Sequence, residues 1–273
     1  MKTLATIIEH TRQRVASAKA REPEPSLRAR AEGAPPCRDF VGVLRGPRRH
    51  AAIIAEVKRK SPSAGWMRPE YASEDFSPEV MAGKYERAGA GAISCLTDPE
   101  FFAGDLVYLA RIRRTCSLPV LRKDFVVDPW QVWESRAAGA DAVLLMAECL
   151  DDGALRESAA IATQLGLGVL LEIHDEANFE RGFAVFRAHP GKILLGINNR
   201  DLATMKVDIS HTPRLAARVP DPSWLVSESG IQTHAHLALL AQAGVRIALV
   251  GEHLMKQTDP GRALAALLSS GQG

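Results

Sequence analysis

The chain has 273 residues, of which 46% are hydrophobic and 24% are charged, as is typical of a globular domain. This balance excludes disorder, collagen and coiled coil for most of the chain, and no stretch reaches the roughly 18 apolar residues that span a bilayer. The formal net charge of +2 is too small for a dedicated nucleic-acid binder. We therefore expect a globular protein whose partner is neither a membrane nor a nucleic acid.

Positive charge is concentrated at the start of the chain. Residues 1–50 hold eleven Lys and Arg against five Asp and Glu, an excess of six. A basic segment of this kind is most often a solvated surface, but it also attracts anionic ligands. Both interpretations stay open at this point.

The cysteines and the N-terminus indicate the cellular compartment. No C-x-x-C pair and no zinc-like spacing connects the four cysteines, which are Cys37, Cys95, Cys116 and Cys149. The apolar run at the N-terminus is interrupted at Glu9, too early for the core of a signal peptide. We predict a cytoplasmic protein with reduced thiols.

The first 50 residues predict two helices joined by a polar segment. Residues 1–20 suit an amphipathic helix, whose apolar face holds Leu4, Ile7, Ile8 and Val15. Prolines and a glycine between residues 23 and 36 indicate a polar connection. A second short helix is expected near residues 39–44.

From residue 51 onward, short apolar runs alternate with segments of helical periodicity. Eight runs have the character of strands, at residues 53–57, 92–96, 119–121, 142–145, 169–173, 193–197, 224–226 and 247–250. The intervening and following segments predict helices that include residues 85–88, 106–112, 132–138, 155–165, 179–186, 215–219, 237–241 and 263–268.

Four junctions repeat the order helix, glycine, strand. They read RAGAGAIS, RAAGADAVLL, QLGLGVLLEI and AQAGVRIALV, and glycine closes a helix at low cost because it readily adopts positive φ. Eight units of about 28 residues predict an α/β fold, a (β/α)8 TIM barrel. We expect a single domain over residues 1–273, with an N-terminal helical extension over 1–50 and the barrel over 51–273.

The alternative architecture is a doubly wound open sheet. Such a sheet usually carries G-x-G-x-x-G after its first strand. Here KRKSPSAG follows the first strand, and no G-x-x-x-x-G-K-[ST] occurs. The closed barrel is therefore favoured.

Polar residues at the C-terminal tips of barrel strands are candidate site residues, because active sites form where these tips meet. On the first strand, alternation places Glu56 and Lys58 on one face, where burial is costly unless they are paired or used. Lys123 ends the third strand. Beside another cation its pKa should be lowered, which suits a general acid or a Schiff-base nucleophile. The alternatives are a structural ion pair and a surface lysine.

Two later tips add a carboxylate, an amide and a cation. Glu172 ends the fifth strand and shares its face with His174, but a metal site would need a third ligand. We therefore expect Glu172 to transfer protons rather than bind a metal. Asn198 and Arg200 follow the sixth strand, where an amide can orient a hydroxyl and a guanidinium can bind an anion. The alternative there is an Asn-rich turn.

Small residues follow the seventh and eighth strands, namely Ser229, Gly230 and Gly251. In many barrels a phosphate lies at these two strands, held by backbone N–H groups. The pattern thus indicates an anion site at the same end of the barrel.

Seven segments occur in order along the chain: IIAEVKRKSPSAG, AISCLTDPEFFAG, PVLRKDFVVD, LLEIH, GINNRDL, SESGI and LVGEHLM. Together with the N-terminal extension, they resemble the indole-3-glycerol-phosphate synthase family. The resemblance implies a carboxy-lyase of L-tryptophan biosynthesis. Its substrate is 1-(2-carboxyphenylamino)-1-deoxy-D-ribulose 5-phosphate, and its products are indole-3-glycerol phosphate, CO₂ and water. It implies no cofactor and no metal.

The resemblance also implies catalytic roles. Lys123 matches the family's general acid, and Glu172 matches a carboxylate that serves later proton transfers. Glu56 and Lys58 match the pair that orients substrate and assists dehydration, with Lys58 also contacting the substrate carboxylate. Whether Lys58 or Glu172 supplies the proton in dehydration stays open.

Other residues match the family's binding positions. Asn198 and Ser229 match residues that shape the anthranilate and hydroxyl contacts. The phosphate would lie on Ser61, Arg200, Gly230, Gly251 and the N–H of Glu252.

The chain departs from the family pattern at a few positions. Ala64 and Trp66 stand where a lysine and an aliphatic residue are common, and Cys95 replaces an aliphatic residue. The alternatives are a sister barrel such as phosphoribosylanthranilate isomerase, a Schiff-base aldolase, and an inactive barrel that binds an anionic metabolite. The intact charged residues at the strand tips favour the synthase. We expect a monomer, with a weak homodimer as the alternative, and an extension that packs over the barrel mouth.

Overall fold

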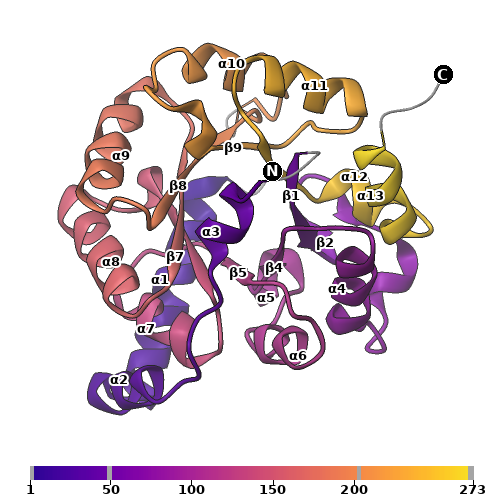
Figure 1. The fold of residues 1–273 in the computed structure, drawn as a ribbon. Helices are drawn as coiled ribbons and strands as arrows, with labels where there is room; N and C mark the ends of the chain where they lie inside the picture. The colour runs from indigo at the N-terminus through magenta and orange to yellow at the C-terminus, as the bar shows by residue number, and fades with distance from the viewer. Residues whose placement is uncertain (1–2, 48–50, 202–203, 270–273) are drawn as a thin grey trace.

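The computed structural model describes residues 3–47, 51–201 and 204–269. Eight parallel strands form a closed barrel, in which β1 pairs with both β10 and β4 (Figure 1). The strands are β1 (Ala52–Val57), β4 (Ala92–Leu96), β5 (Val120–Lys123), β6 (Ala142–Met146), β7 (Gly168–Ile173), β8 (Ile193–Asn198), β9 (Leu225–Glu228) and β10 (Ile247–Val250). The predicted TIM barrel is confirmed, and each predicted strand overlaps one of these.

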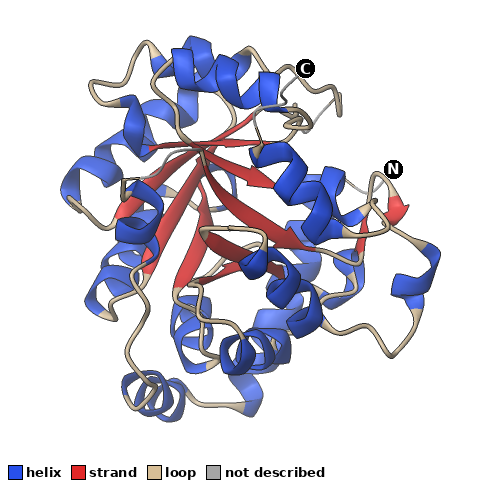
Figure 2. Ribbon diagram, turned by 45° about the vertical axis from the view of Figure 1, so that its right-hand side comes forward, coloured by secondary structure: helices blue, strands red, loops and turns tan. Residues whose placement is uncertain are grey.

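A helix follows each barrel strand and covers its outer side (Figure 2). These helices are α4 (Pro78–Arg87), α6 (Val107–Thr115), α7 (Trp130–Ala137), α8 (Asp152–Gln164), α9 (Glu176–Ala188), α10 (His211–Ala216), α11 (His234–Gln242) and α13 (Pro260–Leu268). Shorter segments are α5 (Pro99–Phe102), α12 (Glu252–Met255), η1 (Pro69–Ala72), η2 (Ala147–Cys149) and η3 (Pro222–Trp224). Within the described ranges, no helix is long and apolar enough to cross a membrane.

The predicted glycine junctions are confirmed. Gly89, Gly139, Gly166 and Gly244 have φ of +92°, +92°, +77° and +80° just after helices. Only glycine adopts such φ without strain, so each helix can turn directly into the next strand.

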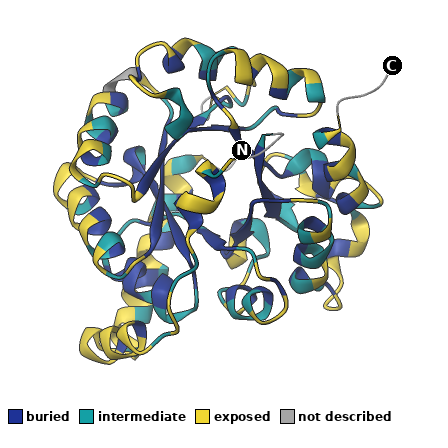
Figure 3. Ribbon diagram, viewed as in Figure 1, coloured by how far each residue is buried: buried dark blue, intermediate teal, exposed yellow. Residues whose placement is uncertain are grey.

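The strands lie inside a ring of helices, so both of their faces are buried (Figure 3). Every residue of β1 and of β7 is buried, for example. Strands of this kind read as continuous apolar runs. A charged residue within such a run therefore stands out in the sequence, which is why strand-tip acids and lysines were informative.

The N-terminal extension reaches both ends of the barrel. Its helices are α1 (Leu4–Arg21), α2 (Glu24–Glu32) and α3 (Phe40–Arg45). Leu4 and Ile7 of α1 line a cavity at the barrel mouth. Figure 1 shows α3 across the end of the barrel that faces the viewer. There Phe40 packs so closely on Gly168 that a Cβ at that glycine would lie 3.0 Å from it.

Two predictions about the extension are wrong. Residues 23–36 contain the helix α2, because Pro23 and Pro25 occupy its first positions, where proline is tolerated. Only α1 lies at the mouth, whereas α2 packs on α7 and α3 closes the other end of the barrel. Residues 1–2 and 48–50 of the predicted extension lie outside the described residues.

A hairpin follows β1 at the mouth. It pairs β2 (Lys60–Ser61) with β3 (Gly65–Trp66) in antiparallel fashion. Two-residue strands give too short a pattern to recognise in sequence. The hairpin brings Ser61 to the cavity rim.

Candidate active site

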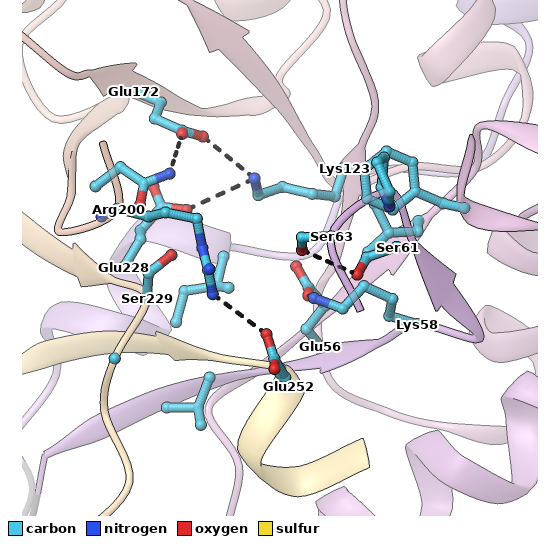
Figure 4. A pocket seen from close by; sticks show the side chains of 18 of the residues that line it. Glu56, Lys58, Ser61, Ser63, Lys123, Glu172, Arg200, Glu228, Ser229 and Glu252 are labelled. Atoms are coloured by element: carbon cyan, nitrogen blue, oxygen red, sulfur yellow. Dashed lines mark hydrogen bonds and ion pairs between the residues drawn. The ribbon is translucent and has the colours of Figure 1, made fainter. Parts of the chain in front are cut away.

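A cavity of about 510 Å³ opens at the C-terminal end of the barrel, where the strand tips meet (Figure 4). Every predicted site residue lines it: Glu56, Lys58, Ser61, Lys123, Glu172, Asn198, Arg200, Ser229, Gly230, Gly251 and Glu252. The closed barrel thus gathers residues from the first to the last strand into one site.

Lys123, at the end of β5, lies against two carboxylates. Its Nζ is 3.2 Å from Oε2 of Glu172 and 3.7 Å from Oε2 of Glu228. Burial opposes its charge, but the neighbouring carboxylates outweigh burial and raise the pKa of Lys123. The prediction of a lowered pKa is wrong, because the charged groups beside Lys123 are the carboxylates of Glu172 and Glu228 and not a cation. This arrangement favours the charged ammonium form of Lys123 over the free amine that a Schiff-base nucleophile requires.

Glu172, at the tip of β7, is 1% exposed and has a partner at each oxygen. Oε2 faces Lys123, while Oε1 accepts a hydrogen bond of 2.7 Å from Nδ2 of Asn198. Oε1 also lies 3.1 Å from Nε2 of His174. Burial raises the pKa of this carboxyl, but Lys123, His174 and Asn198 outweigh burial and lower it. Glu172 is thus an ionised carboxylate that can accept a proton.

Glu228, at the tip of β9, is a site residue that the sequence analysis missed. It is 2% exposed, and burial together with the charge of Glu172 raises its pKa. Gly196 of β8 makes room for it, because a Cβ at Gly196 would overlap Oε1 of Glu228. The signal was present: an acid ends the apolar run in LVSES, as in the first and fifth strands. Two carboxylates with opposite protonation preferences therefore flank Lys123.

Glu56 and Lys58 form a second charged pair, on β1 and just after it (Figure 4). Gly251 lies directly against Glu56, and a Cβ at Gly251 would collide with Oε1 of that carboxylate. Gly251 therefore has a packing role between neighbouring strands β10 and β1, separate from any contact with an anion.

Another part of the cavity carries cations and small residues. Arg200 lies 3.2 Å from Oε2 of Glu252, and Lys256 lies 2.6 Å from Oε1 of the same carboxylate. Ser229 and Gly230 both have positive φ, of +65° and +81°. Two cations beside an exposed loop backbone suit an anionic group such as phosphate. Lys256 was not predicted, because it lies just after the short helix α12, away from the strand tip.

The rest of the lining includes an apolar wall. It contains side chains from four different strand–helix units, among them Leu96, Phe102, Phe125, Leu144, Met146 and Ile231. Such a wall suits a planar aromatic group. Sequence gives no sign of it, since these residues look like ordinary core.

His174, which was expected to share a strand face with Glu172, has a second carboxylate on its far side. Nδ1 of His174 lies 3.2 Å from Oε2 of Glu148. In the part of the chain that the structure describes, no group of three or more His, Cys, Asp or Glu has the arrangement of a metal site. The imidazole thus bridges two carboxylates.

Comparison with known proteins assigns the family. Residues 4–267 match the family model described as indole-3-glycerol phosphate synthase. The chain belongs to the indole-3-glycerol phosphate synthase family. The synthase of Rhodopirellula baltica is 46% identical over 270 residues, covering 99% of this chain and 100% of that protein. The synthase of Variovorax paradoxus is 45% identical over 266 residues, covering 97% and 98%.

One solved structure of low sequence identity is similar to this chain in its fold only. Tryptophan synthase subunit alpha from Legionella pneumophila superposes with a TM-score of 0.58 at 18% identity, over 85% of this chain and 94% of that one. The family resemblance drawn from the sequence is therefore confirmed. As an indole-3-glycerol phosphate synthase, the protein is a carboxy-lyase of tryptophan biosynthesis that acts on a phosphorylated small molecule.

Proposed function

We propose that the cavity holds 1-(2-carboxyphenylamino)-1-deoxyribulose 5-phosphate in one orientation. Its aryl ring lies on the apolar wall, and Lys58 contacts its carboxylate. Asn198 and Ser229 contact the anthranilate and hydroxyl groups. The phosphate lies on Ser61, Arg200, Gly230, Gly251 and the N–H of Glu252. The cations Arg200 and Lys256 at this position support the assignment.

The first chemical step is ring closure. The aryl carbon that bears the carboxylate bonds to the ribulose carbonyl carbon, and the carbonyl oxygen takes a proton from Lys123. The bond to the carboxylate then breaks, CO₂ leaves, and its electron pair restores the aromatic ring. The observation that carries this proposal is the partly buried ammonium of Lys123, held against Glu172 and Glu228 in the cavity.

The second step is dehydration. The ring methylene carbon beside the nitrogen loses a proton to Glu172, and the hydroxyl on the neighbouring ring carbon leaves as water with a proton from Lys58, so that the C–H electron pair becomes the C2=C3 double bond of the indole. The lowered pKa of Glu172 supports its role as acceptor rather than donor. The ammonium of Lys58, paired with Glu56 at 2.6 Å, supports its role as donor. Glu228 orients Lys123 from the other side.

Direct turnover tests this function. Purified protein, incubated with the carboxyphenylamino substrate and a chelator but no added metal, should form an indole product detected by fluorescence. The Lys123→Ala variant serves as the negative control. Absence of turnover by the unmodified protein, or its loss on adding the chelator, would contradict the proposal.

We further propose a cytoplasmic, single-domain monomer. The closed barrel leaves no strand edge open for pairing with another chain. The four cysteines are all free, which fits a reducing compartment. Analytical ultracentrifugation at several protein concentrations tests the oligomeric state, and a concentration-dependent dimer would favour the weak-homodimer alternative.

A further inference from the structure

A partly buried histidine connects the proposed catalytic carboxylate, Glu172, to a second acid, Glu148, outside the cavity. Nε2 of His174 lies 3.1 Å from Oε1 of Glu172, and Nδ1 lies 3.2 Å from Oε2 of Glu148 on η2. The backbone N–H of His174 also donates to Oε1 of Glu148 at 2.9 Å. Glu148 therefore contacts both the ring and the backbone of His174, which fixes the imidazole next to Glu172.

Of these three residues, Glu172 lines the cavity and the other two do not. The side chains of His174 and Glu148 are 11% and 14% exposed. His174 is therefore not among the residues that line the cavity in which substrate would bind. Any effect that it has on the reaction must pass through Glu172.

We propose that His174 is a positioning residue: Glu148 holds it as an imidazolium, and the imidazolium holds Glu172 oriented and ionised for proton transfer. The inference rests on the proposed role of Glu172. It assigns a function to His174 and Glu148, which take no part in the proposed ring-closure and dehydration steps.

The charges around His174 favour the protonated, imidazolium form of its ring. Burial opposes protonation of the ring, but the two carboxylates outweigh it and raise the pKa of His174 to about 10. His211, at the start of α10, contacts the backbone of His174. The other titratable groups that interact with His174 or Glu172 from other elements are Lys123 on β5, Glu228 on β9 and His211 on α10.

The sign of the effect follows from this arrangement. Glu172 has two cationic neighbours, Lys123 and His174, and each lowers its pKa. Removing the charge of His174 leaves one cation, so the pKa of Glu172 should rise. The base would then be protonated at a higher pH, and the acid limb of the kcat profile should move to higher pH.

Two substitutions test the proposal. His174→Asn removes the charge but keeps a polar side chain, and Glu148→Gln removes the outer carboxylate. For His174→Asn we expect kcat to fall about tenfold or more with KM within about threefold of wild type. The acid limb should rise by about one pH unit. Glu148→Gln should move the limb in the same direction by less.

His189→Asn is the matched control. This histidine lies at the far end of α9, where Nδ1 is 3.3 Å from Thr163 Oγ1. Its replacement should change neither kcat nor the pH profile. If His174→Asn behaves like this control, the proposal is overturned. A fall in kcat with a lowered melting temperature and an unmoved acid limb would also overturn it, since that pattern indicates a structural role.

A measurement without turnover separates this proposal from the proposed function. ¹⁵N NMR of the imidazoles, with His174 assigned by its loss in His174→Asn, should show both ring nitrogens protonated at pH 8. Glu148→Gln should lower the pH at which the ring loses its proton. A neutral His174 ring at pH 7 would overturn the proposal even in an active enzyme. An inactive wild-type protein with a charged His174 would contradict the proposed function instead.

Discussion

The ammonium of Lys123 lies between carboxylates whose protonation preferences differ. Glu172 is ionised because Lys123, His174 and Asn198 stabilise its charge, whereas burial and the charge of Glu172 favour the neutral form of Glu228. The ammonium of Lys123 thus faces Glu172, whose ionised form is favoured, and Glu228, whose neutral form is favoured. This arrangement favours the protonated form of Lys123, which is the form that the proposed general-acid role requires.

Replacing Lys123 should remove the general acid. For Lys123→Ala we expect kcat to fall at least about a hundredfold, the usual scale for loss of a general acid. Steady-state kinetics measure the change. Lys192→Ala, an exposed lysine just before β8, is the control and should retain full activity. A near-wild-type rate for Lys123→Ala would reject the role.

Arg200 should contribute to binding more than to chemistry. Its guanidinium serves the phosphate equally before and during reaction, so Arg200→Ala should mainly raise KM, by about tenfold or more, with a small change in kcat. Inhibition by inorganic phosphate should weaken in parallel. An unchanged KM would place the phosphate elsewhere.

Glu228 should make stability depend on pH. Because its folded-state pKa is raised, its contribution to stability is present at acid pH and is lost as the pH rises through that raised value. Gln does not ionise, so the Glu228→Gln variant should not lose this stability as the pH rises. Its melting temperature should therefore exceed that of wild type by about 2–4 °C at pH 9, with little difference at pH 5. Calorimetry at both values tests this, with Glu157→Gln on the surface of α8 as control. An equal shift at both values would argue against ionisation of Glu228 as the cause.

At the scale of elements, an ion pair links α1 to Asp124, the residue just after β5. Arg14 of α1 lies 3.0 Å from Oδ1 of Asp124, which is fully buried. Asp124 also pairs with the buried Arg122 at 2.9 Å and accepts a hydrogen bond of 2.8 Å from Thr97. These contacts hold the residues on either side of Lys123, so the extension helps to fix the position of the proposed general acid.

Loss of this contact should cost more than loss of a surface pair. Arg14→Ala leaves a buried carboxylate with one cation fewer and should lower the free energy of unfolding by about 1–3 kcal/mol. Lys19→Ala breaks an exposed pair with Asp128 and should cost less than about 1 kcal/mol. Denaturant unfolding of both variants gives the comparison. Equal costs would mean that burial of Asp124 adds nothing.

For the molecule as a whole, part of the basic charge of the first 50 residues is used in ion pairs, three of which reach acids outside the extension. Arg14 and Lys19 pair with acids after β5, while Arg30 and Arg45 pair with Glu22 and Asp221. Paired charges attract a distant anion weakly. We therefore expect the extension to contribute chiefly through packing and these contacts, and the cations of the cavity to supply most of the attraction for an anionic substrate.

The salt dependence of the reaction tests that division. Raising ionic strength should lower kcat/KM, because the substrate is an anion and the cavity holds Lys58, Arg200 and Lys256. This dependence should persist in a double variant, Arg12→Gln with Lys19→Gln, within about twofold of the wild-type slope. If the salt dependence of kcat/KM disappears in the double variant, the basic residues of the extension attract the substrate and those of the cavity do not.

The candidate site was predictable where the signal is local. Glu56, Lys58, Lys123 and Glu172 were found because a charged residue at the end of an apolar strand is conspicuous. Glu228 carries the same signal and was overlooked in a serine-rich run. The apolar wall could not be found, because cavity-lining and core side chains have the same composition.

The sequence by itself determined the order of eight strand–helix units, their glycine junctions and the polar residues at the strand tips. These follow from periodicity and backbone preference, which act over a few neighbouring residues. The tertiary structure alone decided which charges face each other. Lys123 was expected beside a cation and instead meets Glu172 and Glu228, from strands far along the chain. Electrostatic energy depends on distance in space, and only closure of the barrel sets those distances.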